Sequence, residues 1–257
     1  MINIRHVANS GFLLAGETWR LLVDALYEPI SYKYNADKPS QRLPLTEYPS
    51  EDSIQAMVEC KPPYDHITAY LASHFHPDHG NLDMIARVKD LKVPVLLPKT
   101  ERFSEQIKAL PNNKIILTAP VEIHCIGDVV INAIRAKHDG SSYFAMEAYA
   151  YLIETPNGVA FFAGDSLTSD AGLRNVLAEF TCDKKIDIAF VNYPEISRER
   201  GRELIKDYIK PGHLFLSHLP GPDVSGKRDV GRLNRSLAQY GSMLPPITIC
   251  EGGELRY

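Results

Sequence analysis

The stretch that decides the fold is His74-Phe75-His76-Pro77-Asp78-His79-Gly80, which places four side chains with metal-binding chemistry within six residues. The chain has nine histidines in 257 residues, so a chance match to His-x-His-x-Asp-His is on the order of one in a thousand. A single imidazole beside a strand is usually a satisfied polar residue. Four candidate ligands this close together instead indicate a metal site.

The residues around this motif turn its ligands toward two positions. The apolar run 67–72 predicts a β-strand that leads into the motif, and the period of two along a strand puts His74 and His76 on one face. Pro77 ends the extended segment, and the chain then turns toward an amphipathic helix predicted near 82–88. In that turn, Asp78 and His79 can bind an ion at a second position nearby. The motif therefore predicts two adjacent ions rather than one.

The donor atoms restrict the choice of metal. Neutral imidazole nitrogen binds zinc, carboxylate oxygen suits zinc, manganese and iron, and no cysteine lies in the motif. We therefore expect two divalent transition-metal ions, with zinc as the first choice and manganese or iron as alternatives.

Composition and charge describe one ordinary globular domain. Of the 257 residues, 44% are hydrophobic and 23% are charged, so we expect a single domain over 1–257. The net charge of −4 comes without a basic block or a basic stripe interleaved with aromatics, which argues against nucleic-acid binding. We expect a small-molecule substrate. The sequence does not specify the oligomeric state, and a homo-oligomer is one of the alternatives.

The first residues and the cysteines indicate a cytoplasmic protein without membrane contact. Residues 1–6 lack a basic start followed by an apolar stretch, and no run reaches the roughly 18 apolar residues that a membrane span requires. The four cysteines show no CxxC spacing and lie mostly beside apolar residues, which is typical of buried free thiols in a reducing compartment.

Alternating and apolar runs predict two halves that each combine strands with helices. Hairpin turns are expected at 9–11, 16–18 and 155–158. Sheets of this kind bury one face against each other and the other under helices, which predicts a layered α/β sandwich. The expected strands are 2–7, 12–14, 20–23, 67–72, 95–97, 115–117, 121–125, 129–136, 148–154, 159–163, 186–191, 214–216 and 247–250, and the expected helices are 82–89, 101–110, 173–180, 200–208 and 230–240.

Residues 27–64 have a different texture, with tyrosine, serine, charge and six prolines between Pro29 and Pro63. Only 53–60 predicts a helix. We interpret 27–64 as an insert outside the core, because a loop this long is unusual unless it covers or shapes a site. The alternative is a mobile surface loop.

Three further candidate ligands, His138, Asp165 and His218, each follow a predicted strand, where loops collect functional groups. Each has an ordinary alternative when taken singly: a turn residue, a helix N-cap and a half-buried polar residue. Together with the motif they extend the candidate metal site to seven side chains.

With these residues in this order, the sequence resembles the metallo-β-lactamase superfamily over nearly its whole length. The resemblance runs from Asn9-Ser-Gly-Phe-Leu-Leu14 and Leu22-Val-Asp24, through the histidine motif, to Lys210-Pro-x6-His218. It implies a four-layered αββα sandwich of two mixed sheets flanked by helices.

The resemblance also implies a role for each candidate ligand. In the family pattern a first ion is held by His74, His76 and His138, a second by Asp78, His79 and His218, and both are bridged by Asp165. Asp78 would act in catalysis as well, by orienting the attacking water or carrying a proton.

The implied activity is metal-dependent hydrolysis. A hydroxide shared between two cations forms near neutral pH, since even one zinc lowers the pKa of bound water to about 7. It would attack the carbonyl or phosphoryl centre of a small ester, lactone or phosphodiester. The early Asn-Ser-Gly-Phe, the Ala-Lys-His138 stretch and the Lys-Pro-x6-His ending look most like the ascorbate-phosphate lactonase branch.

We considered three alternatives to this function, because fold alone does not fix function. A non-catalytic metal-binding or regulatory module would lack a ligand, and none is missing here. An RNA-processing nuclease would share the motif but would carry a basic arm. A flavodiiron-type oxidoreductase would have glutamate in place of His76 and a flavin domain after the core.

Several other side chains are candidates for supporting roles. We expect Asp24 and Asp187, beside apolar strands, to brace strand ends or histidines. Ser166 and Asp139 could hold ligands from outside, and Tyr143 could donate to a developing negative charge. The alternatives for these last three are packing and turn formation.

Overall fold

Two mixed β-sheets, each of seven strands, form the centre of the computed structural model. The model describes residues 1–26, 48–76, 78–89, 91–101, 103–140, 146–219 and 230–255. Each sheet is antiparallel toward one edge and parallel toward the other, because hairpins join neighbours in its meander while helices join its parallel strands.

The first sheet has the strand order β14-β1-β2-β3-β4-β5-β6. Its first three strands in sequence form the expected meander, and the following three pair in parallel with β3 and with one another. The strands are β1 (Asn3–Ala8), β2 (Gly11–Ala15), β3 (Arg20–Val23), β4 (Ala69–Leu71), β5 (Val95–Pro98), β6 (Lys114–Leu117) and β14 (Gly253–Leu255).

The second sheet has the order β13-β12-β11-β10-β9-β8-β7. The expected hairpin turn at 155–158 joins β9 to the central strand β10, with Thr155 opposite Gly158. The strands are β7 (Val121–Ile126), β8 (Val129–Lys137), β9 (Glu147–Thr155), β10 (Gly158–Phe162), β11 (Ile188–Asn192), β12 (His213–Ser217) and β13 (Ile247–Ile249).

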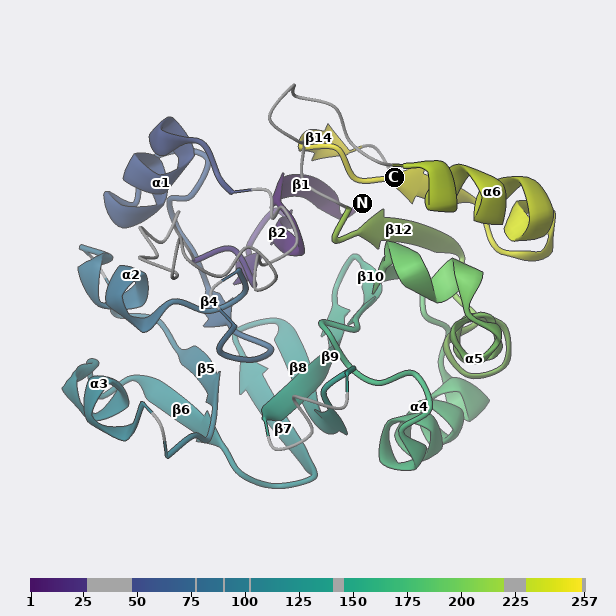
Figure 1. Ribbon diagram of the computed structural model, residues 1–257. Helices are drawn as coiled ribbons and strands as arrows, with labels where there is room; N and C mark the ends of the chain where they lie inside the picture. Colours follow the sequence, from purple (N-terminus) through teal and green to yellow (C-terminus); the bar gives the residue numbers. More distant parts are fainter. Residues whose placement is uncertain are drawn as a thin grey trace, which may run out of the picture.

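Helices cover the outer face of each sheet. Figure 1 shows α1, α2 and α3 along one side of the molecule and α4, α5 and α6 along the opposite side, with the sheets between them. The expected four-layered αββα sandwich is thus confirmed. The helical elements are α1 (Glu51–Val58), α2 (Leu82–Arg87), α3 (Ser104–Ala109), α4 (Ala171–Asp183), the 3₁₀ turns η3 (Tyr193–Ser197) and η5 (Gly241–Met243), α5 (Glu199–Glu203), its π-helical continuation η4 (Leu204–Ile209) and α6 (Gly231–Tyr240).

The alternation of side chains along the strands builds separate cores between the layers. On β2, Phe12 and Leu14 face the other sheet, where Phe12 packs against Phe162 and Phe190. Leu13, between them in sequence, faces the helices α1 and α2 instead. The strands that precede the candidate ligands are therefore buried on both faces, which holds their ends in fixed positions.

Two expectations need correction. β14 was not expected, because Gly252 and Gly253 at its start favour a turn, but its backbone pairs with β1. The segment 27–64 is not wholly outside the core: Ile54, Met57 and Tyr64 are buried in the cluster between the first sheet and its helices. The expectation that the insert 27–64 covers or shapes a site stays a prediction, because its residues 27–47 lie outside the described residues.

The cysteines also differ from expectation. All four are free, but Cys125 and Cys182 are exposed and only Cys250 is fully buried. Apolar neighbours in the sequence did not predict burial of Cys125, because β7 is an edge strand whose outer face is open. Among the described helices, none has the length and apolar content to cross a membrane.

Candidate metal centre

Four loops that follow strands bring all seven predicted ligands together. The loop after β4 carries the histidine motif, and the loops after β8, β10 and β12 carry His138, Asp165 and His218. The second and third of these loops are tied to each other, because His138 bridges to Ser166 and the Asp139 N–H donates to the Asp165 carbonyl at 2.8 Å. Ligands far apart in sequence therefore meet at one place.

A first group consists of His74, His76, His138 and Asp165, whose ligand atoms all lie within 4.8 Å of one another. His74 Nε2 is 3.0 Å from His76 Nδ1 and 3.2 Å from His138 Nε2. Three imidazoles therefore point nitrogen atoms at a common centre, which is the arrangement expected of ligands to one cation.

A second group consists of Asp78, His79 and His218, again with ligand atoms within 4.8 Å of one another. His218 Nε2 is 3.6 Å from Asp78 Oδ2. Asp165 lies between the groups: its Oδ2 is 3.5 Å from His138 Nε2, and its Oδ1 is 3.4 Å from His79 Nε2. One carboxylate therefore presents one oxygen to each group.

Asp24 supports the centre from behind rather than from within. It is 1% exposed, its Oδ1 accepts the Ser73 N–H at 2.6 Å, and its Oδ2 lies 2.7 Å from His79 Nδ1. With Nδ1 engaged, the buried Nε2 of His79 has no hydrogen-bond partner among the described residues and faces the second group. That nitrogen fits a cation, because a metal-binding histidine holds its other ring nitrogen on a carboxylate.

The electrostatics of the cluster also fit a cation. Burial lowers the pKa of His79, but nearby carboxylates, Asp165 foremost, outweigh burial and raise that pKa to about 10. Burial lowers the pKa of His76 to about 4, and burial with the neighbouring His79 holds the pKa of His74 well below its usual range. His74 and His76 therefore offer unprotonated nitrogen, and a cation at the second group would displace the proton of His79.

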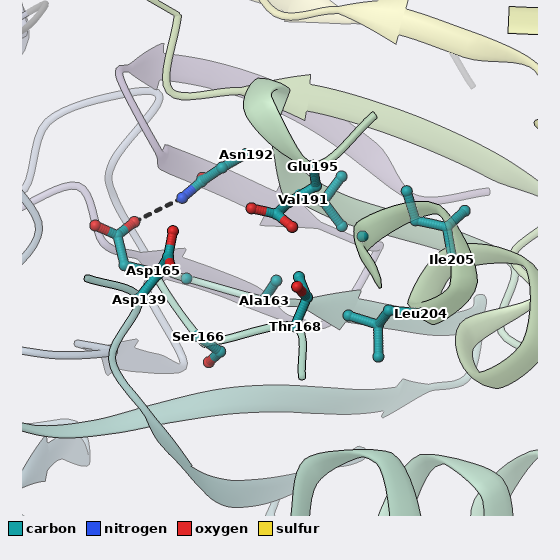
Figure 2. Close-up of a pocket in the computed structure, with 12 residues that line it drawn as sticks. Asp139, Ala163, Asp165, Ser166, Thr168, Val191, Asn192, Glu195, Leu204 and Ile205 are labelled. Carbon is teal, nitrogen blue, oxygen red and sulfur yellow. Dashed lines mark hydrogen bonds between the residues drawn. The ribbon is translucent and has the colours of Figure 1, made fainter. Parts of the chain in front are cut away.

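A chain of contacts supports the loop of His138. The Asp139 carbonyl lies 2.5 Å from His138 Nδ1, which leaves Nε2 for the first group. The Asp139 carboxylate accepts from Arg198, and Arg198 Nη1 also donates to Glu195 Oε1 at 2.7 Å. Burial raises the pKa of Glu195, which lines a small cavity beside Asp165 (Figure 2).

Sequence analysis missed two asparagines that hold the carboxylate ligands. Asn192 Nδ2 donates to Asp165 Oδ1 at 2.7 Å, drawn as a dashed line in Figure 2, and Asn9 Nδ2 donates to Asp78 Oδ2 at 2.9 Å. Asn9 lies in the Asn9-Ser-Gly turn noted in the sequence, whereas no sequence pattern indicated Asn192.

The other candidates for supporting roles have separate outcomes. The bracing role expected of Asp24 and Asp187 is confirmed, since Asp187 Oδ2 accepts the N–H of Val159 at 2.8 Å at the start of β10. Ser166 is buried, and its backbone forms a β-bridge with His138, a residue of the first group. Tyr143 lies outside the described residues.

Comparison with known proteins gives matches among solved structures alone. No family model matches the sequence, and no curated protein does. A possible metal-dependent hydrolase from Veillonella parvula is 14% identical, with a TM-score of 0.69 and 100% of both chains covered. The metallo-β-lactamase fold protein YhfI from Bacillus subtilis is 15% identical, with a TM-score of 0.61 and 99% of both chains covered.

A third similar structure is CmlA, a diiron β-hydroxylase from Streptomyces venezuelae, with 14% identity and a TM-score of 0.64. The alignment covers 100% of this chain and 54% of that one, so this chain spans about half the length of CmlA. Identities this low speak for the fold alone. In its two seven-stranded sheets, its flanking helices and these likenesses, the chain has the metallo-β-lactamase fold.

Proposed function

We propose that this chain is a metal-dependent hydrolase with two adjacent cation positions. The observation that carries the proposal is the carboxylate of Asp165, with Oδ2 3.5 Å from His138 Nε2 and Oδ1 3.4 Å from His79 Nε2. A carboxylate can bridge two cations by directing one oxygen at each, and this side chain has that arrangement.

The residues present fit such cations in number and chemistry. The first position would be held by His74, His76 and His138, the second by Asp78, His79 and His218, and Asp165 would be shared. These ligands supply nitrogen and oxygen without sulfur, which suits zinc first and manganese or iron as alternatives.

Bound cations of this kind lower the pKa of water and polarise the oxygen of a substrate. Asp78 is the residue of the chain that we assign to proton handling. Its Oδ2 is fixed by the Asn9 amide at 2.9 Å, and its side chain keeps 18% of its surface exposed, so it can orient a water molecule or accept a proton at the mouth of the centre. No serine, cysteine or threonine nucleophile is then required.

The substrate that we propose is a small ester, lactone or phosphodiester. Its carbonyl or phosphoryl centre is what an activated water attacks. The likeness of the sequence to the ascorbate-phosphate lactonase branch supports a lactone within this class. A net charge of −4 without a basic stripe supports a free small molecule over nucleic acid.

A substrate panel tests the proposal. Protein stripped of metal and reloaded with zinc, manganese or iron would be assayed on lactones, bis-p-nitrophenyl phosphate and thioesters, with Asp165→Asn as the control variant. We expect turnover of at least one substrate class that depends on added metal and is lost in Asp165→Asn. Turnover that survives both metal removal and the substitution would contradict the proposal.

Oxidation at a diiron centre is a second candidate, favoured by the likeness to CmlA. It predicts oxygen consumption by the iron-loaded protein and no turnover with zinc. Metal binding without turnover of any kind would instead favour a regulatory module. Salt-sensitive binding of tRNA would favour a nuclease.

A further inference from the structure

The turn between β1 and β2 contacts the second group of ligands from outside. Asn9 is 1% exposed and has a φ of 47°, in the left-handed region that asparagine and glycine tolerate. Its carbonyl accepts the backbone N–H of His218 at 3.1 Å. One residue of the N-terminal hairpin thereby fixes the backbone of a ligand more than two hundred positions away.

The same carbonyl is itself held in place. His6 Nε2 lies 2.8 Å from it, and His6 Nδ1 accepts the Gly252 N–H at 2.8 Å. Because Nδ1 accepts, Nε2 carries the proton and donates to Asn9. The backbone of the turn is therefore anchored on strand β1 and on the loop before β14, independently of any cation.

The side chains of the turn reach both carboxylate ligands. Asn9 Nδ2 donates to Asp78 Oδ2 at 2.9 Å. Ser10 Oγ lies 3.4 Å from Asn192 Oδ1, and Asn192 in turn donates to Asp165 Oδ1 at 2.7 Å. If the Asn9 amide were turned over, its oxygen would face the carboxylate of Asp78, so hydrogen bonding requires the donor orientation.

The first group has other supports. His74 Nδ1 lies 2.9 Å from Ser73 Oγ, and His138 Nδ1 lies 2.5 Å from the Asp139 carbonyl. Neither contact involves the turn. Ser73 and Asp24 link the two groups, but the amide of Asn9 bonds to Asp78 and to no imidazole of the first group, so its removal acts directly on the second group alone.

We propose that Asn9 is a positioning residue for the second cation, through its amide bond to Asp78 and its carbonyl bond to the backbone of His218. This inference rests on the proposed function, since it requires two cation positions. Removal of the amide lowers the affinity of the second position and leaves that of the first unchanged. Loss of such an outer partner typically weakens metal binding by about 10- to 100-fold.

Glycine at position 9 isolates the amide. Asn9→Gly keeps the left-handed backbone and its carbonyl, and removes only the bond to Asp78. Asn9→Asp keeps the shape of the side chain but replaces its N–H donor by a carboxylate oxygen that faces the carboxylate of Asp78. Asn157→Gly is the matched control, because Asn157 also lies in a hairpin turn and accepts from Trp19 Nε1 at 3.1 Å, away from the centre.

The experiment is a titration of each metal-free protein with Zn²⁺ in competition with a chromophoric chelator, with circular dichroism to check the fold. We expect two equivalents in the unchanged protein and in Asn157→Gly. In Asn9→Gly and Asn9→Asp one equivalent loses about 10- to 100-fold in affinity while the other is unchanged.

The outcomes separate the inference from the proposed function. Two unchanged equivalents in Asn9→Gly, or an equal loss at both positions, would overturn the role of Asn9 and leave the proposed function standing. Wild-type affinity in Asn9→Asp would show that donation by the amide is not needed. Fewer than two equivalents in the unchanged protein would overturn both.

Discussion

Replacement of Asp24 by asparagine tests how far the centre depends on a residue outside the seven predicted ligands. Asp24 is 1% exposed and accepts hydrogen bonds from the backbone and hydroxyl of Ser73, while its Oδ2 lies 2.7 Å from His79 Nδ1. The asparagine side chain has the same shape but would turn an N–H donor toward a donor already present. The substitution therefore breaks at least one charged hydrogen bond and leaves its partner buried.

The magnitude follows from those contacts. Hydrogen bonds to charged groups contribute about 1.5–3 kcal/mol each, and removal of one partner of a buried charged pair costs about 3–5 kcal/mol. We expect the unfolding free energy of the metal-free Asp24→Asn protein to fall by about 3–5 kcal/mol. We also expect zinc affinity to fall by about 10- to 100-fold, because His79 loses the bond that orients its ring.

Urea denaturation in the presence of a chelator and a zinc titration would measure the two effects. Asp187→Asn is the control, since that carboxylate also braces a strand end but lies outside the candidate ligand groups. It should lower stability and leave zinc affinity unchanged. Zinc affinity that is equally unaffected in Asp24→Asn would refute the orienting role of Asp24.

Other substitutions and conditions test separate parts of the account. Asp165→Ala should reduce bound metal and abolish hydrolysis with the fold intact by circular dichroism; unchanged turnover would refute the bridging role. Zinc binding should release a proton from His79, whose pKa is raised from 6.5 to about 10, so zinc affinity should rise with pH up to about 10. Calorimetry in two buffers of different ionisation enthalpy should then give different binding enthalpies, and equal enthalpies would contradict the release of a proton. In the metal-free protein, the stability that this proton contributes is complete below pH 6.5 and is lost as the pH rises through about 10. Gly201→Ala would place a Cβ against the Glu195 carbonyl oxygen, so thermal denaturation should show a loss of about 1–3 kcal/mol, and wild-type stability would contradict the close packing there.

Local patterns made the histidine motif and most strands predictable. The spacing of His74 and His76 depends on one strand end, and the turn at 155–158 is specified by its own residues. His138, Asp165 and His218 could be grouped with the motif because each follows a strand. Their convergence then depends on how the strands are ordered in the sheets, which the family resemblance supplied.

The supports of the centre could not be predicted, because they join residues with no local signal. Asn9 and Asp78 are separated by 69 positions, and Asn192 and Asp165 by 27. An asparagine in a turn or at the end of a strand has many ordinary roles, and its partner is known only once the sheets are assembled. β14 was missed for a related reason, since its pairing with β1 is made by backbone atoms of a glycine-containing segment.

Anomalous diffraction at the zinc edge, on crystals of the zinc-loaded protein, tests the central claim most directly. The account predicts two peaks about 3.5–4 Å apart with the carboxylate of Asp165 between them. One peak should lie at His74, His76 and His138, and the other at Asp78, His79 and His218. A single peak, no peak, or peaks away from these side chains would contradict it.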